Sequence, residues 1–320
     1  MAVVTQLGSS KRGDPSLLIK LCNKKRVFLF DCGESNFTAS QLKQVDVVLI
    51  SHAHVDHFIG FDRLLRVNLT DAKDILVLGP PGIVENVEGK LRGYTWNITE
   101  KLHLRLFVAA LYHEDSRVYR FDSVEGFVRH PTDRLIDSRQ PLEDDDLTIT
   151  TAALDHKIPS IAYCLLEKQF YNVRKDSLER LGFGPGPWLG ELKRRVGSGE
   201  DLSGTLQVHE RTFTLGELKR ELLLPKQRFK IVYVTDVIYA PENRAKIVEL
   251  ARDAELFFCE AYFRKEDEER ARNAFHLTTE QAGFLAAEAG VHRLVPIHIS
   301  KRYQNVADVL AEIATVFERI

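Results

Sequence analysis

The chain has 320 residues, a hydrophobic fraction of 44%, a charged fraction of 28% and a net charge of −2 at pH 7. These values are typical of a globular protein with a large core, and they exclude a protein that attracts nucleic acid through its overall charge. No apolar stretch approaches the ~20 residues of a membrane span, so we expect no membrane partner.

The cysteines and the N-terminal segment favour a cytoplasmic protein. The four cysteines are scattered, and no two of them form a Cys-x-x-Cys pair. Cys164 and Cys259 lie in apolar runs and are expected to be small buried residues. The N-terminus has no basic region followed by an apolar core. We therefore expect a reduced, cytoplasmic protein without a signal peptide, disulfides or a thiolate zinc site.

The spacing of apolar residues predicts strands and helices along most of the chain. In chain order they are strands 17–21 and 26–30, a short helix 40–45, strand 46–51, helix 58–69, strand 75–78, a helix from Pro81 to about 92, strands 102–109, 117–121, 147–153 and 230–235, helix 243–251, strand 256–259, helix 279–289, strand 293–297 and helix 305–317. Strands dominate the first half and strand–helix pairs the end, which favours an α/β fold of layered mixed sheets.

Residues 168–228 interrupt this pattern and show little of the apolar spacing of a buried core. Long irregular insertions in compact domains are usually functional or disordered. The insertion holds a Gly-Pro run at 182–190, a basic run at 193–195 and several aromatic residues. A local excess of positive charge with aromatic side chains suits contact with RNA, although a solvated linker with incidental charge remains an alternative.

Six residues, His52-Ala53-His54-Val55-Asp56-His57, contain three of the eleven histidines. They follow an apolar run that is typical of a buried strand entering an active-site loop. Imidazole and carboxylate ligands suit zinc and related divalent ions. His52 and His54 can chelate one ion while Asp56 and His57 turn toward a second.

Three further candidates, His156, Asp236 and His298, each follow the end of a predicted strand. Ligand sites of α/β sheets collect at such positions, so we expect these side chains to complete the metal site. The histidines without this setting are expected to be surface or structural residues: His103, His113, His130, His209 and His292.

In this order, Asp31 and the ligand candidates resemble the metallo-β-lactamase superfamily over essentially the whole chain. Three segments are similar to the ribonuclease Z (tRNase Z) family, whose members trim the 3′ end of precursor tRNA: 259–263 resembles its His-Glu-Ala-Thr motif, 275–282 its His-Ser-Thr motif, and 184–193 the tip of its tRNA-gripping arm. The resemblance implies an αββα four-layer sandwich formed by residues 1–320 as a single domain, with a tRNA-binding arm inserted at about 168–228.

The resemblance also implies two zinc ions, with manganese or iron as possible substitutes. One ion would be held by His52, His54 and His156. The other would be held by Asp56, His57 and His298. Asp236 would bridge the two ions, and Asp31 would support the motif loop through hydrogen bonds.

The resemblance further assigns the chemistry and the partners. His276 would give a proton to the leaving 3′ oxygen, with Glu260 as its partner and Asp56 as a third candidate catalytic residue. Taken from the sequence alone, His276 could instead be a histidine at a helix start, and Glu260 a salt-bridge partner. Precursor tRNA would be the substrate, and a homodimer the assembly. The candidate substrate-binding residues are Gly184, Pro185, Gly186, Pro187, Lys193 and Arg194.

Three functions remain open from the sequence. The first is a zinc-dependent endoribonuclease that removes the 3′ trailer of precursor tRNA through a metal-activated water. The second is a hydrolase of the same fold that acts on another phosphodiester or an ester. The third is a noncatalytic relative that binds RNA or metal.

Overall fold

The structure is a computed structural model that describes residues 3–22, 26–112, 115–168, 170–226 and 228–320. The chain divides into two compact units. The first unit comprises Met1–Glu143, Thr148–Leu165 and Lys230–Ile320, and the second comprises Asp144–Leu147 and Leu166–Phe229. No helix in these described ranges is long and apolar enough to cross a membrane.

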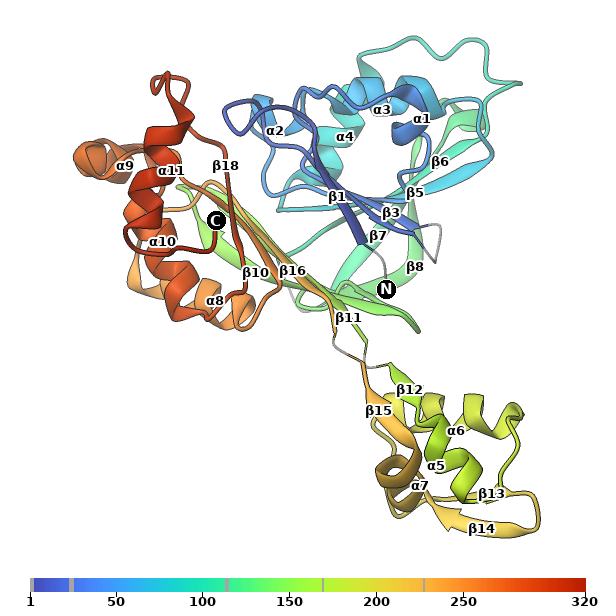
Figure 1. Ribbon diagram of the computed structural model, residues 1–320. Helices are drawn as coiled ribbons and strands as arrows, with labels where there is room; N and C mark the ends of the chain where they lie inside the picture. Colours follow the sequence, from blue (N-terminus) through green and yellow to red (C-terminus); the bar gives the residue numbers. More distant parts are fainter. Residues whose placement is uncertain (1–2, 23–25, 113–114, 169, 227) are drawn as a thin grey trace. The chain divides into compact units, whose positions relative to one another are not determined.

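The first sheet of the first unit has eight described strands in chain order (Figure 1). They are β1 Val3–Leu7, β2 Leu17–Leu21, β3 Arg26–Phe30, β4 Val47–Leu49, β5 Lys73–Gly79, β6 Leu104–Ala110, β7 Asp115–Asp122 and β8 Arg129–Asp137. Strands β3 to β6 run parallel, and the pairs on either side are antiparallel. The helices that follow the parallel strands pack their apolar faces on this sheet: α1 Ala39–Leu42, α2 Val55–Phe58, α3 Phe61–Asn68 and α4 Ile83–Arg92.

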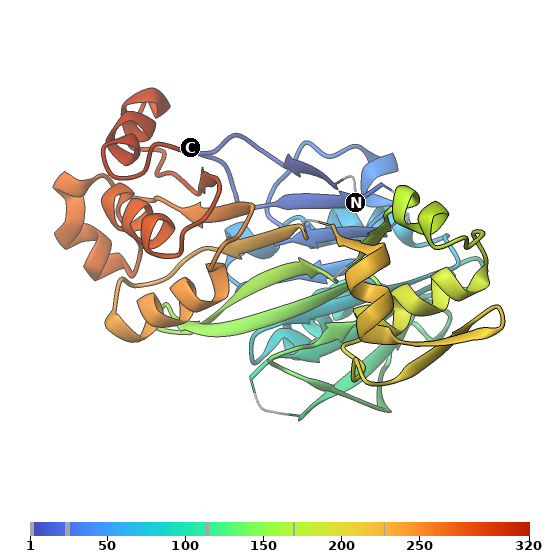
Figure 2. The same cartoon turned by 60° about the horizontal axis from the view of Figure 1, so that its bottom comes forward.

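The second sheet has the strand order β18-β17-β16-β11-β10-β9. Its strands are β9 Leu142–Glu143, β10 Leu147–Asp155, β11 Pro159–Glu167, β16 Lys230–Val234, β17 Leu256–Glu260 and β18 Leu294–Ile297. Strands β16, β17 and β18 are parallel, so their carboxyl ends meet at one edge. Helices on this side are α8 Pro241–Ala251, α9 Glu268–Ala274, α10 Thr279–Glu288 and α11 Val306–Ala314. Helix α8 contacts β16, α10 contacts β17 and β18, and α11 packs on α10; Figure 2 shows these orange and red helices together on one side of the view.

Aromatic side chains join the inner faces of the two sheets. The ring of Phe30 on β3 lies 6.0 Å from that of Tyr163 on β11 and 5.6 Å from that of Tyr233 on β16. The Tyr163 hydroxyl donates to the carbonyl of Ile50 at 2.7 Å, just beyond β4. Two packed sheets with helices on both outer faces confirm the predicted α/β four-layer sandwich.

Several predicted elements have different boundaries in the structure. The predicted helix 58–69 corresponds to α3, which begins only at Phe61, and Phe58 instead ends the preceding helix α2, before Gly60. The Gly60 N–H donates to the Cys32 carbonyl at 2.7 Å, and a Cβ at Gly60 would lie 2.4 Å from the Gly33 carbonyl oxygen. This close backbone approach breaks the helix. Strands β1, β8, β9 and β11 and helix α9 were not predicted.

The second unit has a core and elements of its own, which the apolar spacing of 168–228 did not predict. Its elements are β12 Tyr171–Val173, α5 Lys175–Arg180, α6 Pro187–Gly197, β13 Thr205–Val208, β14 Arg211–Thr214, α7 Leu215–Leu222 and β15 Leu223–Pro225. Leu192, Leu215 and Leu222 are fully buried in this core. The apolar residues are divided among short helices and hairpins, so no single stretch is long enough to show a clear period.

Candidate metal centre and active site

The histidine segment lies at the carboxyl end of β4, as predicted. Ser51 and His52 are buried at the end of the strand, and the chain then turns into α2 with His54 at its N-cap. Asp56 occupies the first turn of α2, and His57 is fully buried on it. The short helix therefore turns Asp56 and His57 away from the direction of the strand that carries His52.

The other candidate ligands come from the second sheet. Asp236 follows β16, and His298 follows β18, at the edge where these parallel strands end. His156 lies in the turn between β10 and β11. Asn243 at the start of α8 fixes this turn, because its side chain bonds both the N–H and the carbonyl of Asp155.

Three of the predicted site residues have a left-handed backbone. Asp31 and His298 come directly after β3 and β18, Asp236 comes two residues after the end of β16, and their φ values are 50°, 51° and 49°. Positive φ is uncommon outside glycine, although Asp and His tolerate it better than most residues. Strained conformations of this kind cluster at functional sites, and here they turn three side chains at the ends of strands.

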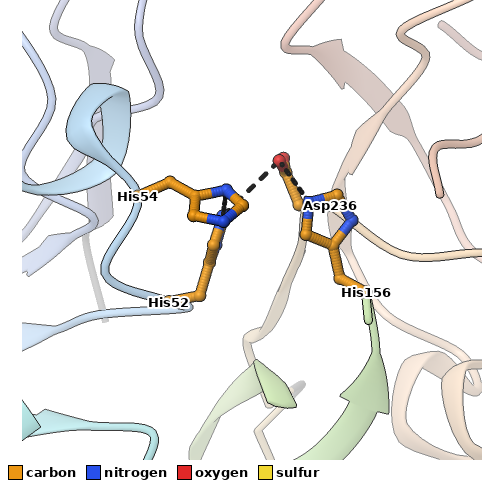
Figure 3. A group of neighbouring side chains, drawn as sticks. All are labelled: His52, His54, His156 and Asp236. Atoms are coloured by element: carbon orange, nitrogen blue, oxygen red, sulfur yellow. Dashed lines mark hydrogen bonds and ion pairs between the residues drawn. The ribbon is translucent and has the colours of Figure 1, made fainter. Parts of the chain in front are cut away.

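Four side chains form the first candidate ligand group: His52, His54, His156 and Asp236 (Figure 3). Their ligand atoms all lie within 4.8 Å of one another. Asp236 Oδ2 is 3.6 Å from His52 Nε2 and 3.5 Å from His156 Nε2, and His54 Nδ1 is 2.8 Å from His52 Nε2. These atoms converge on a common point from two different sheets.

A second group gathers at the other oxygen of the same carboxylate. Asp236 Oδ1 is 3.4 Å from His57 Nε2 and 2.7 Å from His298 Nδ1. Asp56 Oδ2 lies 3.5 Å from His57 Nε2 and 3.4 Å from His298 Nε2. Asp236 therefore faces both groups with one oxygen each.

Asp31 positions the second candidate ligand group through buried hydrogen bonds. It is fully buried, and its Oδ2 accepts a hydrogen bond from His57 Nδ1 at 2.9 Å. The Ser51 N–H donates to Asp31 Oδ1 at 2.7 Å, and the Tyr233 hydroxyl donates to Oδ2 at 2.8 Å. The carboxylate thus orients the His57 ring and joins the motif loop to the second sheet.

Several residues that position the candidate ligands were not predicted from the sequence. The Ser51 hydroxyl lies 3.1 Å from His52 Nδ1. His156 Nδ1 lies 2.7 Å from the carbonyl of Phe275, which it can reach only because the fold brings these segments together. The Thr235 hydroxyl donates to Asp236 Oδ1 at 2.7 Å. A hydroxyl residue directly before a candidate ligand, as at 51 and 235, was the available signal.

Burial and charge give the two groups different protonation. Burial lowers the pKa of His52 to about 2, so this ring is neutral at neutral pH. Burial also lowers the pKa of His57, but the charges of Asp236 and Asp31 outweigh it and raise that pKa to about 10. Asp236 likewise outweighs the burial of His298 and raises its pKa. The second group therefore favours positive charge, and a divalent ion would displace these protons.

The residues fit divalent cations. His57 Nε2 is buried and has no hydrogen-bond partner in the described part of the chain. A buried polar atom without a partner is costly, and a cation between His57, Asp56 and His298 would satisfy it. The donors are imidazole nitrogens and carboxylate oxygens, which suit zinc, manganese or iron.

Comparisons with known proteins agree with this geometry. Residues 14–68 match the model of the metallo-β-lactamase superfamily, and residues 221–299 match that of the β-lactamase superfamily domain. A ribonuclease Z of Deinococcus radiodurans is 31% identical over 282 residues, which cover 87% of this chain and 83% of that protein. The chain belongs to the ribonuclease Z family of the metallo-β-lactamase superfamily.

A second relative is also a ribonuclease Z, and two solved structures share the fold. A ribonuclease Z of Bacillus subtilis is 28% identical over 307 residues, covering 92% of this chain and 85% of that protein. The crystal structure of the short form of human tRNase Z shares the fold, with a TM-score of 0.53 at 16% identity over 94% of each chain. A metallo-β-lactamase fold protein of B. subtilis has a TM-score of 0.58 at 16% identity, covering 99% of this chain and 94% of that one. The family assignment makes the chain a hydrolytic nuclease.

Glu260 and His276 form a pair beside the candidate metal ligands of this ribonuclease Z family member. Glu260, fully buried at the end of β17, accepts a hydrogen bond from His276 Nδ1 at 2.7 Å. Its other oxygen accepts from the Val237 N–H at 2.8 Å. Burial lowers the pKa of His276, but Glu260 outweighs this and raises it. Tyr262 stacks on the His276 ring at 4.1 Å and 10°.

The predicted substrate-binding residues all lie in the second unit. Gly184, Pro185 and Gly186 precede α6, and Pro187 is its first residue, so the predicted loop tip is partly a helix start. Lys193 and Arg194 are on α6.

The structure places four of the five histidines that were expected to be surface or structural residues. His103, His209 and His292 are exposed, and His130 pairs with Glu125 at 2.8 Å. His113 lies outside the described residues.

Proposed function

We propose that this protein is a zinc-dependent endoribonuclease of the ribonuclease Z type, which removes the 3′ trailer from precursor tRNA. The observation that carries the proposal is the placement of Asp236. Its two oxygens face two separate ligand groups, one containing His52 and His156 and the other containing His57 and His298. Paired cations of this kind serve in-line displacement at phosphorus.

The ligands divide as the family resemblance implies. His52, His54 and His156 would hold one ion, and Asp56, His57 and His298 the other, with Asp236 shared. Two bound divalent ions would supply Lewis-acid stabilisation of the phosphoryl oxygens and lower the pKa of a water from 15.7 to about 7.

His276 provides the proton that the leaving 3′ oxygen needs. Its Nδ1 is engaged by Glu260, so Nε2 is the nitrogen available to substrate. The carboxylate favours the protonated ring, which is the form that can donate. Glu260 also accepts a hydrogen bond from the N–H of Val237, the residue directly after Asp236. The partner of His276 is therefore held by the same loop that carries the bridging carboxylate.

Precursor tRNA is the substrate in this proposal because the curated relatives are named ribonuclease Z. The second unit would be the arm that binds it. Neither Lys193 nor Arg194 has a side-chain ion pair or hydrogen bond to another described residue, and phosphate contacts from such side chains supply much of the affinity for RNA. A homodimer and a cytoplasmic location belong to the same proposal.

The test is cleavage of a precursor tRNA with a 3′ trailer by the zinc-loaded protein. We expect one cut directly after the discriminator nucleotide, leaving a 3′ hydroxyl. Hydrolysis of bis-(p-nitrophenyl) phosphate without trailer removal would overturn the proposal in favour of a hydrolase of other phosphodiesters or esters. Metal binding without hydrolysis of either substrate would favour the noncatalytic reading.

A further inference from the structure

A small pocket opens beside His276 in the first unit. It has a volume of about 90 Å³, and its lining residues are Ile238, Tyr239, Glu268, Arg272, His276 and Gln281. One water occupies ~30 Å³ in the liquid, so the pocket admits a small polar group of a larger ligand. None of these lining residues belongs to the proposed metal ligands.

The pocket adjoins the place where the reaction would occur. Ile238 and Tyr239 continue the chain from Asp236, and their neighbour Val237 donates its N–H to Glu260. His276 forms another wall, with its Nδ1 engaged by Glu260. A phosphodiester chain whose scissile group lies at Asp236 and His276 therefore passes this pocket with an adjacent part of its backbone.

Arg272 gives the pocket a positive charge that is available to a ligand. Its side chain is exposed and makes no ion pair or hydrogen bond with another described residue. Nearby arginines are committed: Arg264 pairs with Glu312 at 3.0 Å, and Arg270 with Asp267 at 3.2 Å. A free guanidinium presents a rigid fork of N–H donors that matches phosphate oxygens.

Glu268 limits which anions can use the pocket. One of its carboxylate oxygens accepts from Gln281 Nε2 at 3.4 Å, and its charge opposes that of an entering anion. A free anion would gain little from Arg272 against this repulsion. A phosphate already held nearby through the rest of an RNA chain pays less entropy for the same contact.

We propose that this pocket binds a non-reacting phosphate next to the scissile one, with Arg272 as its ligand. The inference rests on the proposed endoribonuclease function and adds to it a residue that selects polynucleotides over small diesters. Arg272 acts on substrate binding, and its removal should change KM more than kcat.

The test compares Arg272→Ala with Arg270→Ala, which removes the same charge from the same helix at a residue outside the pocket. Precursor tRNA carries flanking phosphates, whereas bis-(p-nitrophenyl) phosphate has a single phosphate. For Arg272→Ala we expect the KM for precursor tRNA to rise about tenfold, in line with the loss of a hydrogen bond to a charged group. Arg272→Lys should recover part of this loss, and Arg270→Ala should match the wild type.

Glu268→Gln provides a change of opposite sign, because removing the carboxylate should lower the KM for precursor tRNA. Equal KM values in Arg272→Ala and the wild type would overturn the inference while leaving the proposed function standing. Equal fractional losses of kcat/KM on both substrates would overturn it too, because they would indicate a general structural role. A wild-type protein that hydrolyses the small diester but not precursor tRNA would overturn the proposed function and this inference with it.

Discussion

Asp31 can be used to test whether residues that only position the candidate ligands affect metal binding. It touches His57, Ser51 and Tyr233, but it belongs to none of the candidate ligand groups. Partners that orient metal-bound histidines typically change metal affinity by 10–100-fold when removed.

We therefore expect Asp31→Asn to weaken zinc binding about 10–100-fold, measured by competition with a chromophoric chelator. Asp74→Asn is the matched control, because Asp74 pairs with Arg105 on the surface at 2.6 Å and lies near the start of β5, whereas the candidate ligands follow the ends of strands. Equal zinc affinity in Asp31→Asn and the control would show that the buried hydrogen bonds do not position the ligands.

His276 should contribute to turnover rather than to metal content. We expect His276→Ala to lower kcat about 10²–10⁴-fold, the usual range for a positioned acid or base, while zinc per chain stays at the wild-type value. His292→Ala, at an exposed histidine, is the control. A loss of zinc in His276→Ala would make this residue a ligand instead of a proton donor.

At the residue scale the sequence indicates the candidate ligands better than the residues that position them. His52 to His57 are contiguous, and Asp236 and His298 follow readable strands, so spacing alone indicated them. The Phe275 carbonyl that holds His156 belongs to a segment 119 residues away. Such a contact depends on how two loops meet in the folded chain, and no local pattern encodes it.

The second unit, at the scale of elements, has a core that can be perturbed separately. Leu192 on α6 is fully buried there, whereas Leu202 is 40% exposed. Truncating a buried leucine to alanine typically costs ~2–5 kcal/mol.

We expect Leu192→Ala to open the second unit to limited proteolysis and to reduce cleavage of precursor tRNA, while hydrolysis of bis-(p-nitrophenyl) phosphate continues. Leu202→Ala should behave as the wild type. If Leu192→Ala abolished both activities, the second unit would be part of the scaffold of the metal centre.

Replacing the whole second unit tests its role in RNA binding without leaving a partly folded core. The Glu167 N–H donates to the Phe229 carbonyl at 2.9 Å, so the two ends of the segment already meet. A short Gly-Ser turn in place of 168–228 should remove precursor-tRNA binding, measured by a mobility shift, and leave hydrolysis of the small diester. Unchanged binding of precursor tRNA would contradict the role of an arm.

The strands of the two buried sheets were easier to predict than those at the edges. Strands β4, β16 and β17 are apolar except for Lys230 at the start of β16 and Glu260 at the end of β17, whereas β8 is mostly exposed and contains Pro131. Strand β11 begins at Pro159, directly after the turn that contains His156. Because proline is typical of turns, the start of this apolar strand was not recognised from the sequence. In the second unit, α5 and α7 have too few residues for a period to emerge from one sequence.

For the whole molecule, the candidate ligands come from both sheets, whose inner faces also meet through aromatic packing and buried hydrogen bonds. His52 to His57 follow the first sheet, and His156, Asp236 and His298 follow the second. Their positions at strand ends predicted that these residues converge, but not how closely, because the distance between β4 and β16 is set by packing such as that of Phe30 on Tyr233.

Bound metal should therefore stabilise the whole first unit. At a free concentration 100-fold above Kd, one bound ion adds ~2.7 kcal/mol. We expect a chelator to lower the thermal unfolding midpoint of the wild type and readded zinc to restore it, measured by calorimetry. Asp236→Asn should lose most of this zinc-dependent shift; a shift as large as in the wild type would argue that Asp236 does not hold metal.

Anomalous diffraction at the zinc absorption edge, from crystals grown with zinc, tests the dinuclear centre most directly. The account expects two peaks flanking the Asp236 carboxylate, one among His52, His54 and His156 and the other among Asp56, His57 and His298. A single peak, or two peaks that Asp236 does not touch, would contradict it.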